Sequence, residues 1–148
     1  MGQYNASLNS GRIEAEDFFK MQGTAAAKME QGSGDDAFEV MGLNTGASLE
    51  FPHLSVGPSE ANITLVLSNG GSVTTGQVEV QDAETGVVYG TCDVPTSDAW
   101  DAYLDLACGS LPSGEVNLVL SFGGAEDSEV FAHLDYFYLS PTSAWETA

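Results

Sequence analysis

Basic residues are almost absent from this sequence. It contains three Lys and Arg residues against 22 Asp and Glu residues, which gives a formal net charge of −19. All three bases lie in the first 28 residues with only three of the acids, so the rest of the chain carries 19 acids and no base. Because phosphate groups and anionic lipids are bound by clustered basic side chains, the charge excludes nucleic acid as a partner and disfavours a membrane surface.

Long hydrophobic runs and histidines are also scarce. No stretch approaches the ~20 apolar residues of a membrane-spanning helix, and the N-terminus lacks the apolar segment of a signal peptide. We therefore expect a mature domain, and the strongly acidic surface fits a secreted, extracellular protein. His53 and His133 are the only histidines, and neither lies in a pattern typical of a catalytic base.

Cysteine occurs only twice, as Cys92 and Cys108, which enclose fifteen residues. A disulfide across a loop of this size would add about 3 kcal/mol of stability in the chain-entropy model. Two buried free thiols are the alternative. The sequence alone leaves both states open.

What the chain does contain is a series of short segments in which apolar and polar residues alternate, as in half-buried β-strands. The clearest are residues 62–68, 77–81, 100–106 and 116–122. A further strand begins at Ser48 and is expected to end or lie at an edge near Pro52. Gly, Pro, Asn, Asp and Ser separate the segments, which predicts an all-β sandwich of jelly-roll type with about nine or ten strands in two antiparallel sheets.

The length of 148 residues suits one such domain. We expect a flexible N-terminal leader over residues 1–11, the β-sandwich domain over residues 12–141, and a C-terminal tail or linker over residues 142–148.

Two carboxylates share one face of a short segment near the start of the chain. Glu14 and Glu16 are two residues apart, so in a strand they point the same way and repel each other. A calcium ion, which binds 6–8 oxygen ligands, would relieve this repulsion. Asp135 is the candidate for a distant third carboxylate, because the first and last strands of a sandwich can pair. The alternative is that the Glu14/Glu16 face is simply hydrated.

Aromatic residues in loops suggest a sugar-binding site. Aromatic rings stack on the flat C–H faces of sugars, while Asn, Asp or Glu bind the hydroxyl groups. Trp100 follows a Pro-Thr-Ser-Asp-Ala segment, where its ring could face solvent; a buried core tryptophan is the alternative. Phe38 and Tyr103 are weaker candidates. His133, two residues before Asp135 and on the same face of a regular strand, could approach a ligand there.

Five segments in this order and spacing resemble those of carbohydrate-binding module family 6, the β-jelly-roll modules attached to hydrolases of plant and algal polysaccharides. They are Arg12–Glu16, Ser48–Phe51, Asp98–Tyr103, Leu111–Leu118 and Leu134–Phe137. Each is weak alone, and the resemblance extends from the first segment to the last, over nearly the whole chain.

This resemblance implies a structural calcium ion held by Glu14, Glu16 and Asp135. It also implies a sugar cleft in the loops at one edge of the sandwich, with Trp100 as the stacking residue and His133 where the family has asparagine.

A second aromatic residue usually faces the tryptophan in this family, from a loop that corresponds to Met41, Gly42, Leu43 and Asn44. The tyrosine is missing here, and Phe38 or Met41 could substitute for it. Some members of the family bind sugar on the concave face of a sheet instead.

The expected function is therefore that of a non-catalytic module, monomeric and attached to a catalytic domain. It would anchor a polysaccharide-degrading enzyme to a neutral β-linked glycan of the xylan, β-glucan or agarose type. The acidic surface makes binding of anionic glycans unfavourable. The alternatives are a small extracellular glycosidase or lyase on the same fold, and a calcium-dependent adhesion domain with a protein partner.

Overall fold

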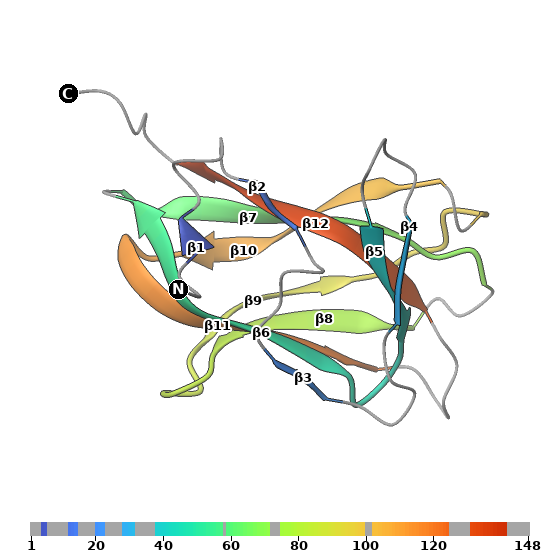
Figure 1. Ribbon diagram of the computed structural model, residues 1–148, viewed down its shortest axis with the longest axis horizontal. Helices are drawn as coiled ribbons and strands as arrows, with labels where there is room; N and C mark the ends of the chain where they lie inside the picture. The colour runs from blue at the N-terminus through green and yellow to red at the C-terminus, as the bar shows by residue number, and fades with distance from the viewer. Residues whose placement is uncertain are drawn as a thin grey trace.

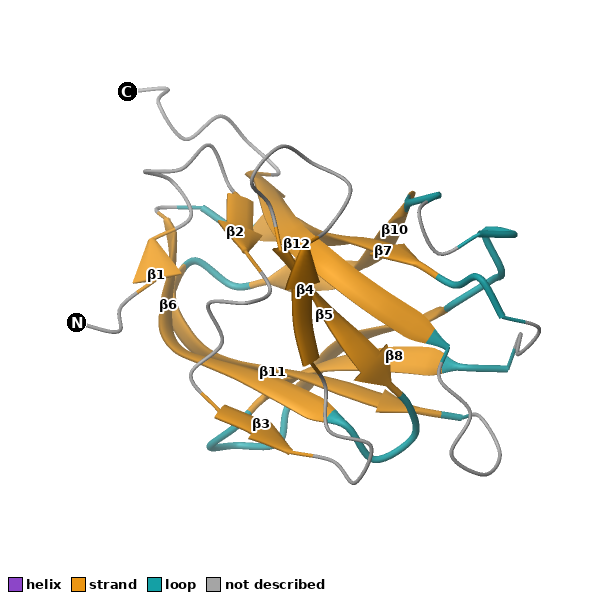
Figure 2. Ribbon diagram, turned by 45° about the vertical axis from the view of Figure 1, so that its right-hand side comes forward, coloured by secondary structure: helices purple, strands orange, loops and turns teal. Residues whose placement is uncertain are grey.

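The chain folds into two stacked β-sheets (Figures 1 and 2). The computed structural model describes residues 43–57, 59–71, 75–99, 102–124 and 131–141, and it describes the backbone of five short strands nearer the N-terminus. None of these residues forms a helix, so the described part of the chain has no helix that could span a membrane.

The first sheet has the strand order β1-β6-β11-β8-β9, and β3 also pairs with β6. The pairs are antiparallel except for β1 with β6, which run parallel. The strands are β1 (Tyr4–Asn5), β3 (Lys20–Gln22), β6 (Ser48–Gly57), β8 (Gln77–Asp82), β9 (Val88–Asp93) and β11 (Gly114–Gly123).

The second sheet has the order β10-β7-β12-β5-β4, and β2 also pairs with β12. Its strands are β2 (Arg12–Glu14), β4 (Lys28–Gln31), β5 (Phe38–Leu43), β7 (Ala61–Ser68), β10 (Leu104–Leu111) and β12 (Ala132–Pro141). The predicted sandwich of two sheets is confirmed, and the described part of the chain contains twelve strands, several of them only two to four residues long. The expected pairing of the strand that carries Glu14 with the last strand is confirmed as well, because Glu14 lies opposite Tyr136.

Apolar side chains from both sheets fill the space between them. In β11 every second residue is buried, as the alternation predicted: Val116, Leu118, Leu120 and Phe122. Across the sandwich the rings of Phe51 and Phe137 meet edge to face, with centroids 5.1 Å apart. Burial of each such side chain contributes about 1.5–3 kcal/mol, so this core accounts for most of the favourable energy of folding.

Pro52 does not end its strand, although a strand end there was one of the two alternatives expected. β6 continues to Gly57 and pairs with β11 along its length, with a register shift where Leu118 opposes Phe51 and Val116 opposes Leu54. Pro52 and His53 form the extra residues of this bulge, and His53 takes a positive φ of 57°. A bulge removes the need for a ladder hydrogen bond from proline, which is why the strand tolerates it.

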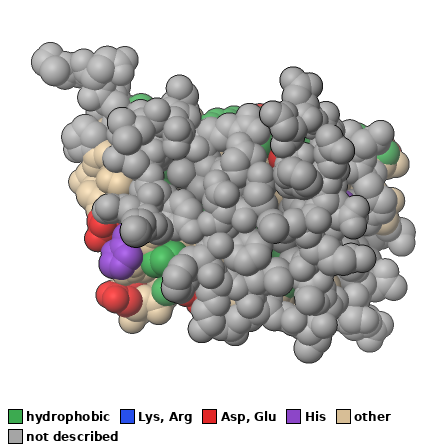
Figure 3. Space-filling model, viewed as in Figure 1, with side chains coloured by type: hydrophobic (Ala, Val, Ile, Leu, Met, Phe, Trp, Pro, Cys, Tyr) green, Lys and Arg blue, Asp and Glu red, His purple; other side chains and the backbone are tan. Residues whose placement is uncertain are grey.

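His53, in the bulge, is exposed. Its backbone N–H donates to Asn117 Oδ1 at 3.0 Å, and its Nδ1 lies 3.4 Å from Glu115 Oε1. The side chains of His53 and Glu115 are 63% and 50% exposed, so this pair is a hydrated surface contact worth little stability. Figure 3 shows a histidine beside acidic side chains at one side of the molecule.

The strand predicted over residues 100–106 begins later than expected. β10 starts at Leu104 and continues through Cys108 to Leu111, while Ala102 and Tyr103 precede it in a loop. The alternation of Ala102, Leu104 and Leu106 suggested one continuous strand, but among the described residues the pairing with β7 begins at Leu104. Strand pairing therefore overrides the local pattern here.

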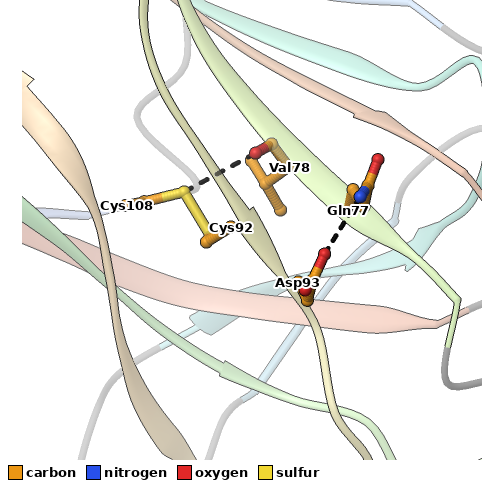
Figure 4. The surroundings of a disulfide bond; sticks show 5 residues. All are labelled: Gln77, Val78, Cys92, Asp93 and Cys108. Carbon is orange, nitrogen blue, oxygen red and sulfur yellow. Dashed lines mark hydrogen bonds between the residues drawn. A yellow bond between two sulfur atoms is a disulfide. The ribbon is translucent and has the colours of Figure 1, made fainter.

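A disulfide joins the two sheets along one side of the sandwich. Cys92 of β9 and Cys108 of β10 are bonded, with Cα atoms 5.0 Å apart, and Cys108 Sγ lies 3.6 Å from the carbonyl oxygen of Val78 (Figure 4). β9 and β10 are the last strands of their respective sheets. The structure therefore resolves the alternative left open by the sequence in favour of the disulfide.

Two glycines allow the backbones of these strands to touch. A Cβ atom on Gly90 would lie 2.3 Å from the carbonyl oxygen of Cys108, and one on Gly109 would lie 2.6 Å from that of Tyr89. Gly109 also has a φ of +120°. Only glycine fits at this distance, so the two sheets close against each other beside the disulfide.

Candidate functional site

The ends of three strands of the second sheet meet at one end of the sandwich. The described residues that follow β7 and β9 lie at the right-hand end of Figure 1. Pairing places Leu43, at the end of β5, opposite Ala132, and Ser68, at the end of β7, opposite His133. The backbone N–H of Phe131 also donates to the carbonyl oxygen of Leu43 at 3.0 Å. This meeting point is called the loop end below.

Buried polar side chains concentrate at the loop end and along the start of β12. Six polar residues in the described part of the chain are buried, and five lie in this region: Asn44, Ser68, Asn69, His133 and Asp135, each at most 6% exposed. Burial of polar groups costs free energy that a purely structural core avoids. Their concentration here identifies the loop end as the candidate site.

His133 is neutral at this position. Burial lowers the pKa of its imidazole to about 4, because the charged form loses its hydration. A neutral imidazole has one N–H donor and one nitrogen acceptor, and an asparagine amide likewise has both donor and acceptor groups. His133 can therefore exchange hydrogen bonds with an uncharged ligand that carries hydroxyl groups.

The loop that precedes Trp100 in the sequence is fastened to the end of β7. The backbone N–H of Ser97 donates to the carbonyl oxygen of Asn69 at 2.8 Å, and the N–H of Asn69 donates to Ser97 Oγ at 3.0 Å. The Thr96 hydroxyl lies 3.0 Å from the Asn69 carbonyl oxygen as well. Since Ser68 pairs with His133, these bonds place residues 96–99 beside the histidine end of β12.

On the other side of β12, the turn that contains Asn44 crosses from the second sheet to the first. The N–H of Ala47 donates to the Asn44 carbonyl oxygen at 3.0 Å, and Gly46 and Ala47 exchange backbone hydrogen bonds with Phe122 of β11. Gly46 has a φ of +99°, which the turn requires. Asn44 is thereby held rigidly between the sheets.

The structure therefore brings together two of the predicted sugar-binding residues, His133 and Asn44. Tyr103 is half-buried in the loop before β10. Phe38 and Met41 lie in β5, which pairs with β12, but their side chains are outside the described residues. Trp100 also lies outside them.

Sequence reasoning missed Asn69 and Ser97. Both lie in segments rich in turn-forming residues, Asn-Gly-Gly-Ser and Pro-Thr-Ser-Asp, which predict loops but not which loops meet. Only the pairing of β7 with β12 and β10 brings the two segments together.

The predicted calcium ligands are only partly described. Asp135 is buried, at 5% exposed, in β12, and the neighbouring Tyr136 lies opposite Glu14. The side chain of Glu14 and all of Glu16 lie outside the described residues. A register shift between Leu134 and Tyr136 interrupts the alternation, so spacing no longer places Asp135 on the His133 face. No group of three acidic, His or Cys side chains suited to a metal occurs among the described residues.

A shallow groove of about 150 Å³ lies on the outer face of the first sheet. Its lining comes from β8, β9, β11 and the residue after β11: Gln77, Glu79, Thr91, Ser121, Phe122, Gly123 and Gly124. Phe122 points into the core at 2% exposed, so the groove offers hydroxyl, amide and carboxylate groups but no exposed aromatic ring.

An all-β sandwich with a polar site among its loops defines a ligand-binding module. The model of carbohydrate binding module family 6 matches residues 14–141, and the chain belongs to this family. As a member of it, the chain is a non-catalytic module that binds carbohydrate, which excludes the glycosidase or lyase alternative. No curated protein matches the sequence significantly.

Solved structures with the same fold include several family 6 modules. One from Clostridium stercorarium in complex with cellobiose is 19% identical, with a TM-score of 0.74 over 95% of this chain and 98% of that one. A β-1,3-glucan binding module from Bacillus halodurans is 17% identical, with a TM-score of 0.78 over 93% and 98% of the two chains.

A larger enzyme also contains this fold. The glycoside hydrolase family 43 arabinoxylan arabinofuranohydrolase from Bacillus subtilis is 17% identical, with a TM-score of 0.78. The match covers 95% of this chain but only 28% of the enzyme chain. At these identities the likeness concerns the fold alone.

Proposed function

We propose that this module binds a neutral β-linked glycan at the loop end and anchors an attached polysaccharide-degrading enzyme to it. The observation that carries the proposal is the gathering of buried, uncharged hydrogen-bonding groups, Asn44 and His133, next to the fastened loop of residues 96–99. Neutral amide and imidazole groups suit sugar hydroxyls, and the surplus of acids opposes anionic glycans.

The solved structures with the same fold support a β-linked glycan as the class of ligand. The Clostridium stercorarium module was solved in complex with cellobiose, and the Bacillus halodurans module binds β-1,3-glucan. The enzyme from Bacillus subtilis supports attachment to a hydrolase, because this fold occupies a quarter or so of its chain. A disulfide fits the extracellular location that we propose, since disulfides persist in oxidising compartments.

The test is a binding panel. Calorimetry and affinity gels with xylan, β-1,3-glucan, cello-oligosaccharides and agarose should give saturable binding to at least one of them. An absence of binding to all four would sink the proposal and favour the adhesion-domain alternative.

Trp100→Ala should weaken binding by at least about tenfold, because loss of a stacked ring removes about 1.4 kcal/mol or more. The matched control is Trp145→Ala, which removes the only other tryptophan, in the predicted tail. Calorimetry on both variants should show a loss for the first alone. Equal affinities would place the site elsewhere.

The groove on the first sheet is the second location to test. Ser121→Tyr would fill it with a bulky side chain while leaving the loop end intact. We expect affinity to stay within about twofold of the parent protein, because binding at the loop end does not use this surface. A larger loss on Ser121→Tyr than on Trp100→Ala would transfer the site to the groove.

We also propose a structural calcium ion, bound by Glu14, Glu16 and Asp135. The buried carboxylate of Asp135 and the pairing of its strand with that of Glu14 support it. Chelation should lower the melting temperature by several degrees, because a ligand of the folded state stabilises it by mass action, and added calcium should restore it. Asp135→Asn should abolish this response. Identical melting with and without chelator would exclude the ion.

A further inference from the structure

The hydroxyl of Ser97 links two backbone segments that the sequence separates. It accepts a hydrogen bond from the N–H of Asn69 at 3.0 Å and donates one to the carbonyl oxygen of Ala99 at 2.9 Å. The same carbonyl oxygen accepts from the N–H of Ala102 at 3.2 Å. Ser97 therefore connects the end of β7 to residues on both sides of Trp100 in the sequence.

The neighbouring Thr96 provides a second link. Its hydroxyl lies 3.0 Å from the Asn69 carbonyl oxygen and 3.2 Å from that of Gly71, and it accepts from the N–H of Asp98 at 3.0 Å. Asp98 has a φ of +72°, a left-handed conformation that aspartate adopts more readily than most residues other than glycine. The two hydroxyls thus fix residues 96–99, which belong to no strand, to the residues that follow β7.

We propose that Ser97 is a positioning residue for glycan binding, which holds residues 96–99 against the end of β7 before the ligand arrives. This inference rests on the function proposed above. Its physical basis is entropic: a loop that is already ordered does not lose conformational freedom on binding, so more of the contact energy appears as affinity.

The experiment compares Ser97→Ala with Ser97→Thr, which keeps the hydroxyl. Calorimetry with cellohexaose, xylohexaose and a β-1,3-linked glucan hexasaccharide, below the melting temperature of each variant, should show Ser97→Ala about three- to tenfold weaker on the sugars that the parent protein binds. Ser97→Thr should recover most of the affinity. Thr96→Val, which removes the second link, should weaken binding similarly. Ser113→Ala, at an exposed hairpin serine, is the control and should match the parent protein.

A spectroscopic measurement separates positioning from a general loss of stability. In a Trp145→Phe background Trp100 is the only tryptophan. Its quenching by acrylamide without sugar should increase in Ser97→Ala and in Thr96→Val, and should stay at the parent value in Ser97→Thr and Ser113→Ala. A purely structural role for Ser97 would lower the melting temperature and leave quenching and affinity unchanged.

The outcomes distinguish the two proposals. If the parent protein binds sugar and both Ser97→Ala and Thr96→Val retain its affinity and its quenching, the positioning role is wrong while the proposed function stands. If the parent protein binds none of the sugars tested in either assay, the proposed function fails and this inference fails with it.

Discussion

His133 couples the candidate site to pH. Its pKa is about 4 in the folded protein, lowered by burial, against an ordinary value near 6.5. Between these values the unfolded chain binds a proton that the folded protein does not bind. The contribution of neutral His133 to stability is therefore fully present above about pH 6.5 and is lost as the pH falls toward 4.

This difference predicts a loss of roughly 2 kcal/mol in the free energy of unfolding between pH 7 and pH 5, since one pKa unit corresponds to about 1.4 kcal/mol. Urea denaturation at pH 7, 6 and 5 measures it. His133→Asn removes the titrating ring and places the family's residue at the position, so its stability should change less over this range. Parallel pH profiles for the two proteins would show that another group is responsible.

At the scale of residues, the sequence indicates which side chains belong to a site better than it indicates which loops are hydrogen-bonded to each other. His133 was predicted from its spacing to Asp135 and from the family resemblance, and Asn44 from the resemblance alone; both are buried at the loop end. Asn69 and Ser97 were not predicted, because their hydrogen bonds run mainly through backbone groups, whose partners depend on which loops the topology brings together. The periodicity of the sequence does not indicate which loops meet.

Among the strands, β9 and β10 depend on glycine for their close backbone contact. Gly90→Ala should destabilise the protein by about 2 kcal/mol or more, because the new methyl group would overlap the carbonyl oxygen of Cys108. Gly123→Ala is the control, since a Cβ there meets no atom within 4 Å and φ is not in the positive range. Thermal denaturation of both variants should show a loss for Gly90→Ala only. Comparable melting temperatures would mean that the strands separate at little cost.

The predicted elements were right where one face is buried along the whole strand, as in β11, where the alternation from Val116 to Phe122 continues without interruption. The strand end considered at Pro52 and the strand start before Leu104 were wrong. At Pro52 a bulge lets the strand continue, because the missing N–H of proline then leaves no ladder hydrogen bond unmade. Before Leu104 the sequence alternation continues beyond the residues that pair with β7. Bulges and strand ends are set by pairing across the sheet, which a single strand's pattern does not contain.

For the whole molecule, the disulfide connects the two sheets rather than two strands of one sheet. Replacing both Cys92 and Cys108 with Ser should lower the free energy of unfolding by about 3 kcal/mol, the loop-closure entropy returned to the unfolded chain. Guanidinium denaturation of the parent protein, with and without a reducing agent, should show the same loss, and the double variant should not respond to the reductant. If neither change lowers the free energy of unfolding, the contact between Gly90 and Gly109 alone would hold β9 against β10.

The contact between β9 and β10 affects how closely several copies of the protein can lie without aggregating. An end strand of a sheet presents unpaired N–H and C=O groups, which can recruit a strand from another molecule and start aggregation. Here the end strand of one sheet is held against the end strand of the other by a covalent bond and by direct backbone contact. Many copies of such a module could therefore lie densely on one polymer surface without joining to each other along this side.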